Sequence, residues 1–450
     1  MSVLGKSAEE IESSFKSGDL TIAVFGMGKM GLPLAAVFAD KGAQVVGMDI
    51  DEDVVEKINE GESHIDKELG LETLVRKNVS EGRLRATSDA VMAASKADVD
   101  VILVPTLTDE KGSVQLGPVE DVTKSIAEGL DEGDVVITEA TMPPGTTESL
   151  VPILGKSGLL LGEFGIGHAP ERTMTGTAVR DITGQYPKII GASDEDTLKV
   201  MKGIYRVVNE KGVIEMSEIT SAEAVKVFEG VYRDVNIGLA NELALYCEEK
   251  GLDALEVFEA ANTQPFCDIH DPGAGVGGHC IPVYPWFVIN QTEKRNNRLL
   301  RTARDINDSM PYYIVDLTVR GLNKVGKSVK NSNILIMGLT FRGGVKEFMK
   351  TPAKPIIMEL NKWDGNIFAY DPMCDKKDAE RFGAKWKEEF DNIDVMVFLT
   401  NHEEFEELKL DKIKNSLRNN IIIDGRNIFD RKRVEKLGYI YRSVGYIGSF

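Results

Sequence analysis

The chain has 450 residues, of which 42% are hydrophobic, and its formal net charge is −19 at pH 7. This length predicts two or three separate cores, and the acidic balance excludes the extended positive surface that nucleic acid or an anionic membrane would require. Because no signal-peptide pattern and no run of about 18 apolar residues occurs, we expect a cytoplasmic protein without a membrane segment.

The first part of the chain predicts a dinucleotide-type α/β domain. Residues 1–19 are expected to form an N-terminal extension. A buried strand at 20–25, a helix at 32–41 and a second strand at 44–49 together form one βαβ unit. Further strand-like runs with helical stretches between them predict a doubly wound parallel sheet, and they lie at 99–104, 134–138 and 188–191.

Helical patterns then replace the strands and are clearest at 221–250 and 292–306. Strand-like runs return at 334–338, 366–371, 395–399 and 421–424. The fold class predicted is therefore α/β, with two Rossmann-like doubly wound domains joined by a central helical region. The expected limits are 1–19 for the extension, 20–214 for the first domain, 215–325 for the helical region and 326–450 for the second domain.

The spacing Gly26-Met27-Gly28-Lys29-Met30-Gly31 lies between the first strand and the first helix. In that context Gly26 permits a tight turn, Gly28 lets the backbone approach a pyrophosphate, and Gly31 allows close packing of helix and strand. Helix N-termini attract phosphates, so Lys29 and Met30 belong to the same predicted site.

Asp49 ends the second strand, where a carboxylate can accept hydrogen bonds from an adenosine ribose. A carboxylate there would repel a 2′-phosphate, so NAD is expected rather than NADP. Asp51 is an alternative acid, although its position favours a cap for the next helix. Thr106 and Thr141 follow later strands and either contact the nicotinamide half or cap Pro-rich turns.

The segment Gly275-Val276-Gly277-Gly278-His279-Cys280 has too many glycines for a helix or strand interior. A cysteine that ends such a loop is placed for access, so we predict a nucleophile at Cys280 rather than an inert buried thiol. Cys247 and Cys267 lack comparable surroundings and are expected to be structural. With no C-x-x-C spacing among the four cysteines, we expect reduced thiols and no metal site.

His279 is not automatically the base for its neighbour, because adjacent side chains need not converge. Lys226 lies on an amphipathic helix expected at 222–242, together with Glu223 and Arg233. Those polar side chains form either a buried polar face or a solvated face.

At these residues the chain resembles the UDP-glucose/GDP-mannose dehydrogenase family from about Leu20 to near its C-terminus. Within that family it is most similar to the enzymes that act on UDP-N-acetyl-D-mannosamine. The motifs that carry the resemblance are the glycine fingerprint, Pro143-Pro144-Gly145-Thr146, Ala169-Pro170-Glu171-Arg172, Arg233-Asp234-Val235-Asn236-Ile237, Ala240-Asn241-Glu242, the glycine-rich cysteine loop, Pro285-Trp286-Phe287 and Gly338-Leu339-Thr340-Phe341-Arg342.

The resemblance implies an NAD-dependent, four-electron oxidation of the C6 alcohol of a UDP-sugar to a carboxylate. Cys280 would hold the sugar as a thiohemiacetal and then as a thioester, Lys226 would stabilise oxyanion charge or relay a proton, and Glu171 would assist hydrolysis. Family cofactor contacts are matched at Thr106 and Thr141. Substrate contacts are implied for Arg172, Thr173, Lys226, Arg233, Gly277, Phe341 and Arg342. A homodimer formed through the long central helix, or a higher homo-oligomer, is implied as well.

The chain differs from the family pattern at several positions that concern hydrolysis and phosphate contacts. They are Thr175, Gly230, Gln264, Phe266, Tyr284, Arg342 and Met349. Three other functions compete with the implied one: oxidation of UDP-glucose, UDP-N-acetylglucosamine or GDP-mannose; nucleotide-sugar binding without catalysis; and a two-electron oxidation of the 3-hydroxyacid type.

Overall fold

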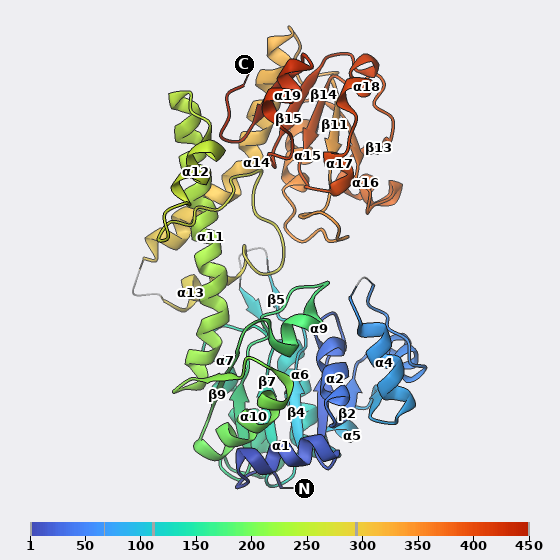
Figure 1. Cartoon of the computed structure of the whole chain (residues 1–450), viewed down its shortest axis with the longest axis vertical. Helices are drawn as coiled ribbons and strands as arrows, with labels where there is room; N and C mark the ends of the chain where they lie inside the picture. The colour runs from blue at the N-terminus through green and yellow to red at the C-terminus, as the bar shows by residue number, and fades with distance from the viewer. Residues whose placement is uncertain (1, 67, 110–112, 293–295, 449–450) are drawn as a thin grey trace. The chain divides into compact units, whose positions relative to one another are not determined.

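A computed structural model describes residues 2–66, 68–109, 113–292 and 296–448 (Figure 1). The chain divides into two compact units, which are described separately. The first comprises residues 1–229 and 286–291, and the second comprises 230–285 and 292–450. The domain limits expected from the sequence stay a prediction.

The first unit is built on an eight-stranded sheet in the order β10-β9-β8-β7-β4-β1-β2-β3. Six strands from β3 to β8 are parallel, whereas β9 runs antiparallel to β8, so the sheet is mixed at that edge. The strands are β1(Thr21–Phe25), β2(Gln44–Met48), β3(Leu84–Thr87), β4(Val99–Ile102), β7(Val135–Thr138), β8(Gly165–His168), β9(Lys188–Ala192) and β10(Val213–Glu215), with a separate hairpin of β5(Leu107–Thr108) and β6(Val114–Gln115).

Both faces of the middle of this sheet are buried, because successive side chains of a central strand enter opposite cores. In β1, Ile22 and Val24 belong to one core, and Ala23 and Phe25 belong to the other. The helices of the unit are α1(Ala8–Ser17), α2(Gly31–Asp40), α3(Glu52–Asn59), α4(Leu71–Ser80), α5(Ala90–Ala94), α6(Gly117–Gly129), α7(Thr146–Ser149), α8(Val151–Leu154), α9(Ala178–Arg180) and α10(Glu195–Val208).

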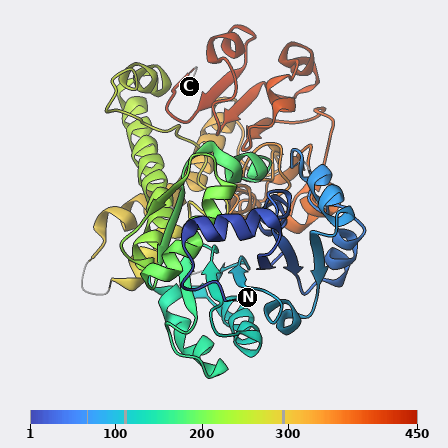
Figure 2. The same cartoon turned by 60° about the horizontal axis from the view of Figure 1, so that its bottom comes forward.

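The expected N-terminal extension contains α1, which Figures 1 and 2 show in dark blue. Ile11 and Phe15 of α1 are fully buried in the core of the first unit. The helix packs closely against α10 at Gly203, where a Cβ atom would lie 2.6 Å from Cβ of Ile11. Residues in the predicted extension thus contribute to the core of the sheet domain.

The central helices are longer than their sequence patterns. The long helix α11(Ile219–Lys250) contains the boundary between the two units. The helix expected at 292–306 is α14(Arg298–Lys324), which begins later and ends later, and residues 293–295 lie outside the described residues. Pro311 is inside α14 and buried, so proline did not end this helix. Two shorter helices are α12(Ala254–Ala261) and α13(Tyr284–Gln291).

The second unit contains a six-stranded, all-parallel sheet in the order β13-β12-β11-β14-β15-β16. Its strands are β11(Asn333–Met337), β12(Asn366–Tyr370), β13(Lys385–Trp386), β14(Val395–Phe398), β15(Ile421–Asp424) and β16(Ile440–Ser443), and its helices are α15(Ala353–Lys362), α16(Lys376–Phe382), α17(Glu403–Glu406), α18(Leu410–Ile413) and α19(Arg431–Lys436). Alternate residues of β11 again enter two cores. The predicted fold class of two Rossmann-like sheets is therefore confirmed.

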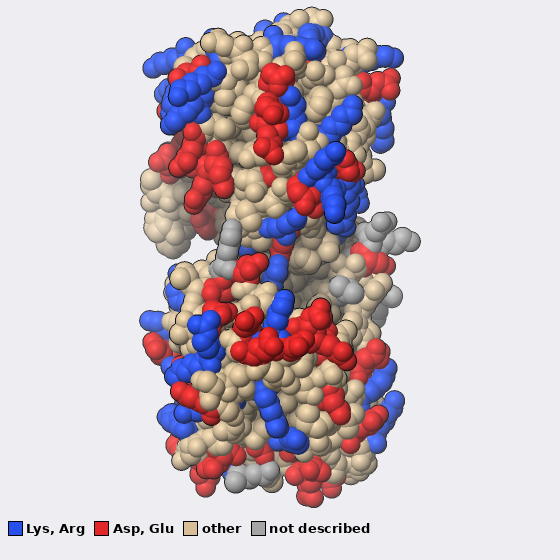
Figure 3. Space-filling model, turned by 90° about the vertical axis from the view of Figure 1, so that its right-hand side faces the viewer, with Lys and Arg blue, Asp and Glu red and all other residues tan. Residues whose placement is uncertain are grey.

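On the face shown in Figure 3, acidic and basic side chains are interspersed and no continuous basic surface is seen. Among the described residues, no helix combines the length and the apolar character that a membrane crossing would need.

Candidate active site

A Cβ atom would meet different surroundings at each of the three glycines of the first loop. Gly26 has φ +96°, and a Cβ there would lie 2.8 Å from the carbonyl oxygen of Leu103. A Cβ on Gly31 would lie only 1.7 Å from the carbonyl oxygen of Gly26, whereas a Cβ on Gly28 would meet nothing within 4 Å. The loop thus has a tight turn, a close packing contact and, at Gly28, open space beside the backbone.

Asp49 closes this loop from the end of β2. Its Oδ2 atom accepts a hydrogen bond of 2.8 Å from the Met27 amide, and its Oδ1 atom accepts one of 3.1 Å from the Asp51 amide. The side chain is only partly buried, so lone pairs are available for a ribose. Asp51 caps α3 through the Asp53 amide, as its position in the sequence predicted.

Two loops predicted to contact the cofactor are joined to each other. The hydroxyl of Thr106 donates a 2.7 Å hydrogen bond to the carbonyl oxygen of Thr141. In the short helix α7, which follows the second loop, the Thr147 amide and hydroxyl donate to Glu223 of α11 at 2.8 and 2.6 Å. Glu223 is 1% exposed and burial raises its pKa, so this part of the helix has a buried polar face. The alternative of a solvated face is excluded at that position.

The segment Glu171–Thr173 follows β8. The Glu171 amide donates to the carbonyl oxygen of Glu139 at 3.1 Å, and the Glu171 carboxylate accepts from the Thr173 amide. The Thr173 hydroxyl lies 3.0 Å from the sulfur of Met30. The structure therefore brings the Pro-Glu motif against the glycine loop within one unit.

Arg172 has several polar and aromatic partners. It forms a 2.6 Å ion pair with Glu229, donates to the carbonyl oxygen of Pro187 at 3.2 Å and lies 4.9 Å from the ring centre of Tyr186. Its charge is already partly compensated, so a substrate contact by Arg172 would compete with Glu229.

Sequence reasoning missed a buried cluster behind this segment. Lys188 of β9 forms a 2.7 Å ion pair with Glu139, and the Tyr205 hydroxyl also donates to that carboxylate. Burial raises the pKa of Glu139, while the nearby Lys188 ammonium lowers it. The signal in the sequence was weak because the three residues come from separate elements. Since the backbone carbonyl of Glu139 accepts the hydrogen bond of the Glu171 amide, the cluster helps to fix the position of the Pro-Glu motif.

Cys280 is an exposed, free thiol in the second unit. Gly275 and Gly278 of its loop have φ values of +127° and +100°, which favour glycine. The carbonyl oxygen of Cys280 accepts hydrogen bonds of 3.0 Å from the Val283 and Tyr284 amides, so the cysteine lies at the start of a helical turn. His279 is also exposed, and of the two cysteines expected to be structural Cys247 is buried and Cys267 is partly exposed.

Phe341 packs on the cysteine loop. A Cβ on Gly277 would lie 2.4 Å from Cβ of Phe341, and a Cβ on Gly278 would lie 3.1 Å from its ring. The Gly278 amide donates to the carbonyl oxygen of Met349 at 2.8 Å. The structure therefore brings the predicted substrate residues Gly277 and Phe341 together, and Arg342 lies with its guanidinium 5.8 Å from the Phe341 ring centre.

The predicted catalytic residues belong to different units. Glu171 and Lys226 are in the first unit, and Cys280 is in the second. Lys226 is half-buried on α11. Arg233, about two turns farther along the helix, is exposed. Convergence of these side chains on one substrate stays a prediction.

Family models match the chain in three consecutive segments. They describe the NAD binding domain of the UDP-glucose/GDP-mannose dehydrogenase family at residues 20–209, its central domain at 220–309 and its UDP binding domain at 335–431. The chain belongs to the UDP-glucose/GDP-mannose dehydrogenase family. It is therefore an NAD-dependent nucleotide-sugar dehydrogenase, and NAD is its cofactor.

Similar members of the UDP-glucose/GDP-mannose dehydrogenase family come from archaea. A UDP-N-acetyl-D-mannosamine dehydrogenase of Pyrococcus horikoshii is 36% identical over 428 residues, which are 95% of this chain and 99% of that protein. One from Methanococcus vannielii is 33% identical and is matched over 96% of its length by 94% of this chain. A solved structure of the Pyrococcus enzyme superimposes with a TM-score of 0.86, covering 95% of this chain and 99% of that chain.

The residues of the first unit fit the NAD of this family. Open space at Gly28, backbone amides at the start of α2 and the accessible Asp49 carboxylate match the pyrophosphate and ribose of a dinucleotide.

Gly230 and Tyr284, two of the positions expected from the sequence to differ from the family pattern, lie in contact. A Cβ on Gly230 would lie 2.3 Å from Cδ2 of the Tyr284 ring. Tyr284 is buried there, and its amide is bonded to the carbonyl of Cys280 one turn earlier. The tyrosine ring thus fills the space beside α11 that a side chain at position 230 would need, so Gly230 and Tyr284 fit each other.

Proposed function

We propose that the protein oxidises the C6 alcohol of UDP-N-acetyl-D-mannosamine to the carboxylate of UDP-N-acetyl-D-mannosaminuronate. The observation that carries this proposal is the exposed free thiol of Cys280 at the end of a glycine-rich loop. An alcohol-to-ketone dehydrogenase has no use for a thiol, whereas oxidation of an aldehyde to an acid gains from covalent capture.

The reaction balances as one alcohol, two NAD⁺ and one water giving one carboxylate, two NADH and three protons. Each oxidation removes a hydride from C6, and NAD supplies the hydride acceptor. Between the two oxidations the sulfur of Cys280 adds to the aldehyde carbon, and the aldehyde oxygen gains a proton. After the second oxidation, water adds to the thioester carbon, the C–S bond breaks and the thiol is restored.

Lys226 and Glu171 are proposed to assist these steps. A lysine ammonium stabilises negative charge that develops on the C6 oxygen, and a carboxylate near the thioester can take a proton from the attacking water. The position of Glu171 is supported by the hydrogen bond from its backbone amide to the carbonyl oxygen of Glu139. The Glu139 side chain belongs to a buried cluster with Lys188 and Tyr205.

The choice of sugar rests on the relatives. Six similar archaeal proteins of 33 to 36% identity are named UDP-N-acetyl-D-mannosamine dehydrogenases, and a Ralstonia solanacearum protein of 33% identity is named an NDP-N-acetyl-D-galactosaminuronic acid dehydrogenase. We propose a UDP-sugar because the matched C-terminal segment is the family's UDP binding domain.

We further propose a homodimer formed along α11. Tyr232, Leu239 and Tyr246 are spaced seven residues apart on that helix and are 54%, 47% and 54% exposed. Such spacing lines up large apolar side chains on one helix face, which favours pairing with a second helix. A sedimentation mass equal to one chain would contradict this assembly.

Because its four cysteines are free, we place the enzyme in the reducing cytoplasm.

The substrate is tested by incubating the purified protein with NAD and a panel of nucleotide sugars. UDP-N-acetyl-D-mannosamine should give the highest kcat/KM, above UDP-glucose, UDP-N-acetylglucosamine, UDP-N-acetylgalactosamine and GDP-mannose. A higher value for another sugar would change the substrate and keep the chemistry. No NADH with any sugar would favour a nucleotide-sugar-binding protein without catalysis.

A further inference from the structure

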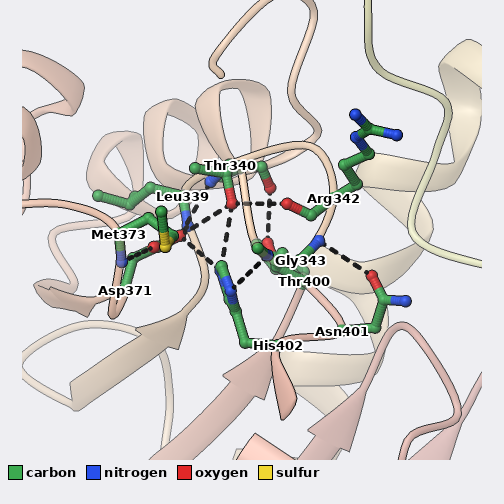
Figure 4. Close-up of polar contacts among 12 residues, drawn as sticks. Leu339, Thr340, Arg342, Gly343, Asp371, Met373, Thr400, Asn401 and His402 are labelled. Carbon is green, nitrogen blue, oxygen red and sulfur yellow. Dashed lines mark hydrogen bonds and ion pairs between the residues drawn. The ribbon is translucent and has the colours of Figure 1, made fainter. Parts of the chain in front are cut away.

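A buried acid–imidazole pair lies at the carboxyl edge of the C-terminal sheet (Figure 4). Asp371 directly follows β12, and His402 lies four residues after the end of β14. Both side chains are 0% exposed, and the Nε2 atom of His402 lies 3.1 Å from Oδ2 of Asp371. Neither residue has a part in the chemistry proposed above.

Asp371 accepts hydrogen bonds from two backbone amides of the loop that follows β11 and from one amide of its own loop. Its Oδ2 atom accepts hydrogen bonds of 2.7 and 3.1 Å from the amides of Leu339 and Thr340, and its Oδ1 atom accepts one of 2.8 Å from Met373. Burial alone would raise the pKa of Asp371, yet the bonds from His402 and from these amides hold it well below its usual value. The carboxylate is therefore an ionised anchor for the loop.

His402 holds the same loop from its other end. Its Nδ1 atom lies 3.3 Å from the Gly344 amide, which is a donor, so Nδ1 must be the unprotonated acceptor. The proton therefore lies on Nε2, which faces Asp371 and the Thr340 hydroxyl at 3.1 and 3.2 Å. One neutral tautomer thus fastens both Thr340 and Gly344.

The neighbours of His402 add two more ties to the loop. The Thr400 hydroxyl donates to the carbonyl oxygen of Thr340 at 2.6 Å, and the Gly343 amide donates to Oδ1 of Asn401 at 3.3 Å. Figure 4 shows these side chains pointing toward the loop from the end of the strand. The backbone of the loop from Leu339 to Gly344 is therefore held by hydrogen bonds with four side chains.

Phe341 belongs to this loop and lies between Thr340 and Gly344, whose backbone amides are held by Asp371 and His402. Its Cβ and ring cover Gly277 and Gly278, where added side chains would lie 2.4 and 3.1 Å away. Cys280 follows two residues later. All of these residues belong to the second unit. Within it, the buried pair holds the loop with Phe341, and Phe341 packs on the glycines that precede Cys280.

We propose that Asp371 and His402 are positioning residues for Cys280, acting through Phe341 on the cysteine loop. The role rests on the proposed function insofar as Cys280 is the nucleophile. A thiol that must meet C6 of a bound sugar loses rate steeply when it is displaced by about 1 Å, so the anchor affects turnover without touching substrate.

The test compares His402→Phe with the control Asp394→Asn. Phenylalanine keeps the ring contact of His402 with Phe405, at 5.2 Å between centres, and removes both nitrogen bonds. Asp394 is an equally buried carboxylate of the same sheet, bonded to the Asn333 amide at 2.8 Å at the opposite strand ends. His402→Phe removes buried hydrogen bonds and Asp394→Asn weakens a buried ion pair with Lys327, and only the first substitution lies next to the loop that carries Phe341.

The first readout is the alkylation rate of Cys280 by iodoacetamide, followed by mass spectrometry of its peptide. We expect His402→Phe to change this rate at least about threefold and to lower kcat about tenfold, with the KM for NAD within about twofold. Asp394→Asn should keep the wild-type alkylation rate. Wild-type alkylation and kcat in a folded His402→Phe protein, or equal changes in the control, would overturn the proposal.

The second readout is amide hydrogen exchange in His402→Asn, whose side-chain oxygen can still accept from Gly344 while the contact with Asp371 is lost. Faster exchange at Gly278 than in the wild type supports the path, and unchanged exchange contradicts it. Alkylation and exchange need no turnover, so they test the positioning role even if no sugar in the panel is oxidised.

Discussion

The two sheets use the same strand-end position in different ways. In the first unit Gly26, with φ +96°, follows β1, and Asp49 at the end of β2 accepts the Met27 amide at 2.8 Å. In the second unit Gly338, with φ +102°, follows β11, and Asp371 after β12 accepts the Leu339 amide at 2.7 Å. The turn and the carboxylate thus recur at the same topological point.

The difference lies in what else the carboxylate meets. Asp49 is partly exposed and retains lone pairs for a ribose, whereas Asp371 is fully buried and bonded to His402 and several amides. A Rossmann-like sheet therefore does not by itself give a ribose-binding acid. In the second unit the acid holds a protein loop, and contact with the nucleotide must come from other residues.

The largest effects are expected at the glycines of the first loop. Gly31→Ala places a Cβ 1.7 Å from a backbone oxygen that cannot move freely, so we expect a loss of about 3 kcal/mol or more in the free energy of unfolding. Gly28→Ala meets no atom within 4 Å and should fold normally, while its Kd for NAD rises about tenfold. Urea unfolding and NAD titration measure the two effects.

Equal losses of stability in Gly28→Ala and Gly31→Ala would contradict these separate roles for the two glycines.

The two strand-end carboxylates should respond differently to the same substitution. Asp49→Asn removes a charged acceptor and should raise the Kd for NAD about tenfold with little change in Tm. Asp371→Asn weakens a buried anchor and should cost about 2 to 4 kcal/mol of stability, with the NAD Kd unchanged. Because the pKa of Asp371 is depressed, its contribution is present at neutral pH and is lost as the pH falls below about 4.

Calorimetry and NAD titration of both variants test this contrast, and a ten-fold change in NAD affinity in Asp371→Asn would show that the comparison is wrong.

The last contrast concerns the opposite ends of the strands. Asp394 precedes β14 and forms a 2.5 Å ion pair with Lys327, whereas Asp98, which precedes β4, has Asp100 and Asp134 as neighbours. Burial raises the pKa of Asp134 to about 7. Between pH 4 and 7 the unfolded chain releases this proton while the folded protein keeps it, so stability falls as pH rises, by at most about 1.4 kcal/mol per unit.

Asp134→Asn should flatten that dependence, and an unchanged pH profile of unfolding would contradict the raised pKa.

Much of the fold was predictable because apolar runs and the glycines at strand ends indicate strands, helices and turns from short stretches of sequence. The helix and strands of the first βαβ unit, and the four strands 334–338, 366–371, 395–399 and 421–424, were each found within a residue or two. The start of α14 was misjudged because helical periodicity does not show where the chain enters the helix. The strand at 188–191 was predicted and is β9, but its antiparallel direction was not, because strand direction depends on long-range pairing.

The site was predictable only where a motif has a local mechanism. Glycine spacing indicated the turn at Gly26 and the packing at Gly31, and the loop composition indicated an accessible Cys280. Glu139 with Lys188, and Asp371 with His402, were not predicted as pairs, because each joins residues at least 31 positions apart that only the folded sheet brings together.

The central claim is a four-electron oxidation through Cys280, and the most direct measurement counts NADH formed per nucleotide sugar consumed. The wild-type enzyme should give a ratio of two with uronate as the product, and Cys280→Ala should form no acid. A ratio of one, or uronate formed by Cys280→Ala at the wild-type rate, would contradict the account.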